Sequence, residues 1–305
     1  MAPFTKIALA GATGNLGRPV LQALLDADFQ VLVLSRIGGS SSKLQAHPNL
    51  LIAEVDFSSS EQMRPSLVGV DVVISCLATV AIDSQNPLID AAEAAGVRRF
   101  IPAEFGMNTP NPQCQKLPVG AWKQSAQRYL ANKHESNPAF TYTAVATGAF
   151  LDWGIEVGFI VDPSRHTATL YNGGDVPFST TNLADIARAL IGVIRNPAQT
   201  ANRVVYVHST VTTQNKLIGY AVEKDGKAWT TTVKDTDTLL KESFAAFEKA
   251  DGAASTEAAA NGFSACACFT SSYGCDFSQH LDNDLLGVET LDEASVRSLV
   301  QKHLF

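Results

Sequence analysis

Three glycines near the start of the chain constrain its fold more than any other feature. The segment Lys6–Gly17, KIALAGATGNLG, is an apolar strand pattern that ends in a glycine-rich turn, and a helical pattern follows over 18–27. Glycines in such a turn allow the sharp bend, the approach of a pyrophosphate to the backbone and close packing of helix on strand. Because a strand precedes the triplet and a helix follows it, the motif predicts a dinucleotide site. The expected contacts come from Gly11, Thr13, Gly14, Asn15, Leu16 and Gly17.

The end of the next apolar strand, 30–34, indicates which dinucleotide binds. It is followed by Ser35 and Arg36, where an NAD-binding unit carries a carboxylate for the ribose 2′-hydroxyl. The Arg36 guanidinium is suited to a 2′-phosphate, and Lys43 adds a second cation in the same loop. These residues favour NADPH or NADP+ as the cofactor. The alternative is that both cations are solvated loop charges.

Strand and helix patterns alternate through the rest of the first half. Strands are expected at Leu50–Val55, Asp71–Cys76, Arg99–Pro102 and Thr141–Ala146. Helices are expected between them near Ser60–Val68, Asn86–Ala95 and Trp122–Lys133. Such alternation produces a parallel sheet with helices on both faces. We therefore expect an α/β fold with a doubly wound parallel sheet, the Rossmann arrangement, which binds its ligand at the carboxyl ends of the strands.

The regular alternation ends near Phe150. Residues 1–150 are expected to form the dinucleotide-binding domain, and 151–305 a smaller mixed α/β substrate region that packs on it or is interleaved with it. Within that region the patterns predict strands at 167–171 and 203–208, a turn at 172–175, and helices at 182–195, 215–224 and 237–249. Thr290–Glu293 has the capping-box pattern for a last helix that ends at His303. The alanine-rich segment 252–262 is compatible with a helix or with a loose surface segment.

Composition narrows the class of protein. The chain has 305 residues, of which 46% are hydrophobic, and this is enough for a large core. A net charge of −7 without a basic stripe argues against nucleic acid as a partner. No apolar run has the length of a membrane span, and the first apolar stretch is interpreted as a strand rather than a signal peptide, so we expect a cytoplasmic protein.

Five cysteines argue against a disulfide framework, because their number is odd and the chain is long. Cys266, Cys268, Cys275 and His280 form a group whose residue types suit a zinc site. Its C-x-C start lacks the usual two-residue spacing, so we expect reduced structural thiols and no metal.

Several segments together resemble a known family. They are Gly11–Gly17, the pair Arg36 and Lys43, the segment RRFIPAEFG at 98–106, and the later segments 141–145, 148–154 and 283–287. The chain resembles the isoflavone reductase-like, NmrA-like branch of atypical short-chain dehydrogenases, in particular its fungal members. The resemblance implies an NADPH-dependent reductase of small aromatic or heterocyclic metabolites. This chain differs from the plant reductases in having Ala103 where they usually carry serine, and in a longer segment between Lys123 and Thr141.

The resemblance also implies a catalytic group. Reductases of this family use a lysine on the helix after the Pro-x-Glu-Phe-Gly segment, and the matching residue is Lys123. A partly buried lysine beside a nicotinamide is able to donate a proton as hydride reaches the substrate. The structural alternative is a lysine that extends from a helix end to solvent. The Tyr-x-x-x-Lys spacings at Tyr129–Lys133 and Tyr220–Lys224 are interpreted as chance matches, the first less firmly.

The remaining candidates lie at strand ends. Cofactor contacts are expected from Leu77, Ala78, Glu104, Phe105, Thr147 and Gly148, and substrate contacts from Phe150 and Trp153. The Glu104 carboxylate is expected either to orient Lys123 or to cap a backbone turn. The loop Thr109–Pro118 is long enough to act as a lid or to shape the pocket.

Three functions remain open from the sequence. The leading one is NADPH-dependent reduction of an enone, imine or quinone methide, with Lys123 as proton donor. The second is a regulator like NmrA that binds NADP(H) without turnover, and the third is a cyclase or isomerase that retains the cofactor cleft. A small molecule is the expected partner, and the chain is expected to be a monomer or a homodimer.

Overall fold

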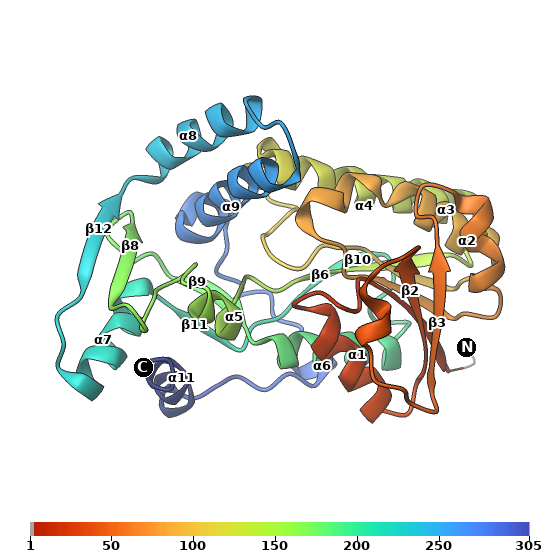
Figure 1. The fold of residues 1–305 in the computed structure, drawn as a ribbon, viewed down its shortest axis with the longest axis horizontal. Helices are drawn as coiled ribbons and strands as arrows, with labels where there is room; N and C mark the ends of the chain where they lie inside the picture. Colours follow the sequence, from red (N-terminus) through yellow and green to blue (C-terminus); the bar gives the residue numbers. More distant parts are fainter. Residues whose placement is uncertain (1–2, 305) are drawn as a thin grey trace.

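A computed structural model describes residues 3–304, apart from the side chains of residues 80, 83, 84 and 253. Its centre is a seven-stranded, fully parallel sheet in the order β10-β6-β5-β4-β1-β2-β3 (Figure 1). The strands are β1 (Lys6–Ala10), β2 (Gln30–Arg36), β3 (Leu50–Val55), β4 (Val72–Ser75), β5 (Arg99–Ile101), β6 (Thr141–Ala146) and β10 (Arg203–Tyr206). The order reverses at β1, so the fold is the expected doubly wound α/β arrangement.

Helices cover both faces of this sheet because its strands are apolar on both sides. Ile7 and Leu9 of β1 pack with α1 (Gly17–Asp26) and α6 (Leu183–Arg195) on one face. Ala8 and Ala10 of the same strand belong to the core of the other face. The helices on that face are α2 (Ser60–Leu67), α3 (Asn86–Ala94) and α4 (Pro118–Ser136) (Figure 1). Alternate residues of one strand therefore contribute to two separate cores.

The second half of the chain builds two smaller sheets. One contains β7 (Ala149–Phe150), β9 (Phe178–Thr181) and β11 (Thr210–Thr212), and the other pairs β8 (Thr167–Tyr171) with β12 (Thr230–Lys234). The helices of this half are α5 (Leu151–Glu156), α7 (Gln214–Asp225), α8 (Thr236–Glu248), α9 (Ala253–Phe269), α10 (Asn283–Leu286) and α11 (Glu293–Gln301). The alanine-rich segment is thus part of a helix, the first of the two alternatives considered for it.

Two features of this half differ from the sequence-based expectation. The capping box at Thr290 is wrong, because α11 begins after Asp292, whose Oδ1 accepts a hydrogen bond from the Ser295 amide at 2.8 Å. The strands β9, β11 and β12 were not predicted. They are rich in threonine and short, so they lack the alternation of apolar and polar residues by which a strand is recognised.

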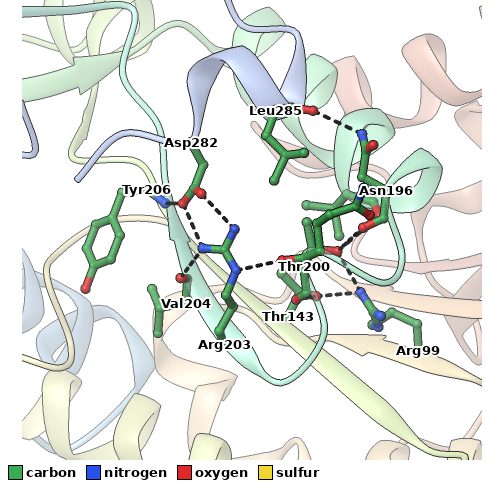
Figure 2. Close-up of polar contacts among 11 residues, drawn as sticks. Arg99, Thr143, Asn196, Thr200, Arg203, Val204, Tyr206, Asp282 and Leu285 are labelled. Carbon is green, nitrogen blue, oxygen red and sulfur yellow. Dashed lines mark hydrogen bonds and ion pairs between the residues drawn. The ribbon is translucent and has the colours of Figure 1, made fainter.

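Two arginines hold the edge strand β10 in place: Arg99 joins it to neighbouring strands, and Arg203 joins it to the C-terminal segment (Figure 2). Arg99 on β5 is 1% exposed and donates to the hydroxyls of Thr141, Thr143 and Thr200 at 2.7, 2.7 and 3.0 Å. It also donates to the Pro197 carbonyl at 2.6 Å, so one side chain joins β5, β6 and the turn before β10.

Arg203 at the start of β10 forms an ion pair with Asp282 at 2.7 Å (Figure 2).

Because β10 and α6 come from beyond residue 150, the large sheet and the second region are interleaved along the chain. The boundary at residue 150 therefore separates two parts of the sequence rather than two parts in space. That 1–150 and 151–305 are separate domains remains a proposal.

Candidate active site

A cavity of about 370 Å³ lies at the carboxyl ends of the central strands. Its wall begins at the turn after β1, continues through the loops after β4, β5 and β6, and is completed by α4, α5 and α9. Of the residues expected at the site, the cavity is lined by Gly14, Asn15, Leu16, Leu77, Ala78, Glu104, Phe105, Lys123, Gly148, Phe150 and Trp153. The expected residues that do not line it are Gly11, Thr13, Gly17, Arg36, Lys43 and Thr147.

The glycine turn has the shape that a pyrophosphate requires. A Cβ on Gly11 would lie 2.3 Å from the Cys76 carbonyl oxygen, and one on Gly17 would lie 2.0 Å from the Gly11 carbonyl oxygen. These two positions allow close backbone packing, whereas Gly14 is exposed at the cavity. Within residues 3–304, no side chain caps α1. The Arg18 amide already donates to the Gly14 carbonyl at 3.1 Å, and Pro19 has no amide hydrogen, so a phosphate would meet the turn amides of residues 15–17. With these amides at the N-terminus of α1, the turn fits a bound dinucleotide.

The two cations expected near the ribose lie at the surface. Arg36 ends β2 and is exposed, and its carbonyl accepts the Gly39 amide at 2.8 Å. Lys43 lies in a short 3₁₀ helix, η1 (Ser40–Lys43), and lines a separate groove together with Thr13. Ser40 links this helix to the glycine turn by a 3.0 Å hydrogen bond to the Thr13 hydroxyl. Both cations are thus accessible to a 2′-phosphate, although they do not share one cavity.

Lys123 lies inside the cavity wall. It occupies the first half of α4 and is only 5% exposed. Its ammonium donates a hydrogen bond to the main-chain carbonyl of Glu104, in the loop after β5. The chain turns sharply there, because the Glu104 amide donates to the Pro102 carbonyl at 2.8 Å. A Cβ on Gly106 would lie 3.3 Å from Lys123 Nζ, so glycine at this position leaves room for the ammonium.

Burial decides the proton affinity of this lysine. Desolvation lowers the pKa of Lys123 below its ordinary value of 10.5, and the nearby Glu104 charge opposes that change. The Glu104 carboxylate itself does not bond to the ammonium. It accepts hydrogen bonds from the Thr109 hydroxyl and from Gln127 Nε2, the latter at 2.9 Å. Glu104 therefore connects the loop to α4 through its side chain and holds Lys123 through its carbonyl.

The loop after β6 contributes the other side of the site. The amides of Thr147 and Gly148 both donate to the Gly106 carbonyl, at 3.2 and 2.9 Å. This contact fixes the end of β6 against the loop that holds Lys123. The side chains of Phe150 and Trp153 follow, with ring centroids 6.1 Å apart in an edge-to-face arrangement. They give the cavity an aromatic surface suited to a flat ring.

The Tyr-x-x-x-Lys pairs lie elsewhere. Tyr129 donates to Asp90 at 2.6 Å, and Lys133 forms ion pairs with Asp90 and Glu93 at 2.8 Å each. Both side chains therefore connect α4 to α3, away from the cavity lining. Tyr220 packs within the core of the second half.

The loop Thr109–Pro118 is anchored rather than free. Asn108 and Asn111 donate to the carbonyls of Gly274 and Ser272, at 3.2 and 3.0 Å. Cys114 is fully buried, and its thiol lies 3.5 Å from the Tyr273 carbonyl. The loop thus shapes the site by packing on the C-terminal segment and by supplying Thr109 to Glu104.

Sequence reasoning missed the contribution of α9. Its residues Glu257, Asn261, Ser264 and Cys268 line the cavity. Their helical spacing within an alanine-rich segment was a usable signal, but a polar stripe on a helix is ordinarily a solvent face.

The described residues contain neither a metal-binding cluster nor a membrane-spanning helix. Across 3–304, no group of three or more His, Cys, Asp or Glu side chains has the arrangement of a metal site. None of the helices in this part of the chain combines the length and apolar character needed to cross a bilayer.

Comparison with known proteins places the chain in a family. The model of the NmrA-like family matches residues 4–244. Oxidoreductase poxI of Penicillium oxalicum is 32% identical over 244 residues, which cover 77% of this chain and 75% of that protein. Bifunctional pinoresinol-lariciresinol reductase 2 of Linum usitatissimum is 29% identical over 258 residues, 78% of each chain.

A solved structure shares the whole fold. The complex of leucoanthocyanidin reductase with NADPH from Vitis vinifera superposes with a TM-score of 0.73 at 18% identity, over 98% of this chain and 99% of that one. The fold class and the family resemblance expected from the sequence are confirmed. The chain belongs to the NmrA-like family.

Proposed function

We propose that this protein is an NADPH-dependent reductase of a small aromatic or heterocyclic metabolite, with Lys123 as the proton donor. The observation that carries the proposal is the position of Lys123. It is a buried ammonium in the wall of a cavity that begins at the glycine turn and ends at aromatic side chains. A structural lysine on a helix surface would extend to solvent instead.

The relatives support the reaction class. Two of them are named as an oxidoreductase and as a pinoresinol-lariciresinol reductase, and the solved neighbour is a reductase in complex with NADPH. The residues of this chain agree with that cofactor. The turn around Gly14 offers the amides of residues 15–17 to a pyrophosphate, and Arg36 stands where a carboxylate would favour NADH.

The residues around the cavity have separate roles in the proposed reaction. Bound NADPH supplies hydride to an electrophilic carbon of an enone, imine or quinone methide. Lys123 Nζ holds the proton that the product requires, and the Glu104 carbonyl fixes the direction of the ammonium. Phe150 and Trp153 orient the aromatic part of the substrate and exclude water from the site.

A direct assay tests the proposal. The purified protein is given NADPH and a panel of aromatic enones, imines and quinones, and both nucleotide oxidation and product mass are followed. Reduction with equal consumption of NADPH is the expected result. Conversion of a substrate without NADPH consumption would instead indicate a cyclase or isomerase, and binding of NADP(H) without any turnover would indicate a sensor.

A further inference from the structure

We propose that one face of α9 selects the substrate by accepting hydrogen bonds from donor groups on an aromatic molecule. The proposal rests on the reductase function above, because it names the substrate class of the same site. The face consists of Glu257, Asn261, Ser264 and Cys268, which we call the α9 stripe. These residues follow one another at steps of four, three and four residues, so they share one side of the helix.

The flanks of the stripe show that it is not an ordinary solvent face. On one side Phe263 and Ala267 are buried in a core with Leu117 and Val119, at the start of α4. On the other side Phe269 packs edge-to-face on Phe178 of β9, with ring centroids 4.9 Å apart. The C-terminal half of α9 is therefore packed against protein on both flanks, and the stripe between them faces the cavity. Beside Glu257, at the other end of the helix, Ala258 is exposed.

Exposure along the stripe falls from one end to the other. Glu257 and Asn261 are exposed, Ser264 is half-buried, and Cys268 is 5% exposed. Cys268 and Lys123 line the same cavity. The stripe thus runs from the open end of the cavity to the proposed proton donor. A substrate that reaches Lys123 would lie along it.

The polar side chains of the stripe mainly offer hydrogen-bond acceptors that have no donor partner. The Ser264 hydroxyl donates to the Ala260 carbonyl at 2.9 Å, which leaves its lone pairs to accept a further hydrogen bond. The Glu257 carboxylate only accepts, and the Asn261 amide does both. Within residues 3–304, neither the Glu257 nor the Asn261 side chain has a hydrogen-bond or ion-pair partner. The complementary ligand therefore carries hydroxyl or ammonium donors.

The rest of the cavity specifies the other half of that ligand. Phe150, Trp153 and Phe159 line the same space and offer aromatic surface. The combination selects an aromatic substrate with donor groups directed toward α9, such as a phenol or a benzylic ammonium. A carboxylate on that end of the molecule would be repelled by Glu257.

Equilibrium binding tests this assignment without requiring turnover. The protein saturated with NADP+ is titrated with benzylideneacetone and with its para-hydroxy, para-methoxy and para-aminomethyl derivatives. We expect the hydroxy compound to bind roughly 3–10-fold more tightly than the methoxy compound, the effect of one neutral hydrogen bond. Asn261→Leu and Ser264→Ala should each reduce that ratio. Glu257→Gln should selectively weaken the binding of the aminomethyl compound, whose ammonium loses a charged acceptor.

The matched control is Glu248→Gln on α8, an exposed carboxylate outside the cavity lining, which should leave every ratio unchanged. Equal binding of the hydroxy and methoxy compounds, or no binding of either, overturns the proposal, as does a ratio that survives both stripe variants. NADPH oxidation with the same compounds is a separate readout. A preference for the hydroxy compound without turnover would contradict the reductase function and support the role of the α9 stripe. Turnover without that preference would support the reductase function and contradict the role of the stripe.

Discussion

The Lys123 ammonium donates a hydrogen bond to the main-chain carbonyl of Glu104, 19 residues earlier in the chain. The acceptor is neutral, so the lysine is buried without a carboxylate bonded to it. The Glu104 carboxylate is occupied by Thr109 and Gln127. This arrangement orients the ammonium while the local burial lowers its pKa, and both effects suit a group that must release a proton.

Replacement of Lys123 tests its role directly. In Lys123→Met we expect turnover to fall roughly 10²–10⁴-fold, the usual contribution of a positioned proton donor, while NADPH affinity changes little. The folded state should remain intact, because methionine fills the same space without a charge to desolvate. Single-turnover kinetics, nucleotide titration and thermal unfolding measure the three quantities. Tyr129→Phe is the matched control and should be nearly silent. Loss of NADPH binding in Lys123→Met would mean that the lysine holds the cofactor instead.

The pH dependence of turnover follows from the same geometry. Burial disfavours the charged form of Lys123, so its pKa lies below 10.5, and the protonated form is the active donor. The rate should therefore be constant at low pH and fall as pH rises through that lowered pKa. Glu104→Gln removes a negative charge that raises the pKa of Lys123. The falling limb should then move to lower pH, with the low-pH plateau preserved. A limb at the same pH in both proteins would argue against Lys123 as the titrating group.

The cofactor preference depends on the end of β2. Arg36 is exposed at the position where NADH-binding proteins carry a carboxylate. A charge-assisted contact to the 2′-phosphate contributes roughly 1.5–3 kcal/mol, so Arg36→Ala should reduce NADPH affinity by about 10-fold or more and leave NADH affinity nearly unchanged. Calorimetric titration with both nucleotides measures the difference. Arg195→Ala, an exposed arginine at the end of α6, is the control. Equal affinity of the unmodified protein for NADH and NADPH would contradict the assignment.

The sequence predicted the parts of the fold that depend on local pattern. The strands β3, β6 and β8 have the expected bounds. Lys123 lines the cavity, and its position could be predicted because its helix follows a recognisable loop. The threonine-rich strands β9, β11 and β12 could not be found, since tertiary pairing rather than periodicity defines them.

The same distinction applies to the site. The sequence does not show which polar face of a helix meets solvent, so the α9 stripe was not recognised. The contact between Lys123 and the Glu104 carbonyl joins two segments that are 19 residues apart in the chain. It depends on the conformation of the turn after β5, which the sequence pattern does not specify. The anchoring of the Thr109–Pro118 loop on residues 272–274 is long-range in the same way.

Arg99 offers a stability test that is independent of the reaction. Burial lowers the pKa of this guanidinium to about 10, so it stays charged at neutral pH. Its acceptors are the hydroxyls of Thr143 and Thr200 (Figure 2), the Thr141 hydroxyl and the Pro197 carbonyl. Arg99→Met removes these donors and leaves the Pro197 carbonyl without its hydrogen bond from Arg99. We expect a loss of unfolding free energy on the order of 3 kcal/mol.

Chemical denaturation of Arg99→Met measures this loss, with Arg195→Ala as the surface control that should change the unfolding free energy by about 0.5 kcal/mol or less. NADPH affinity at a temperature where the variant is folded should stay near that of the unmodified protein, because Arg99 lies outside the cavity lining. A variant as stable as the unmodified protein would show that the methionine side chain packs well enough to offset the lost hydrogen bonds. The join between β5, β6 and β10 would then depend on the backbone pairing of these strands.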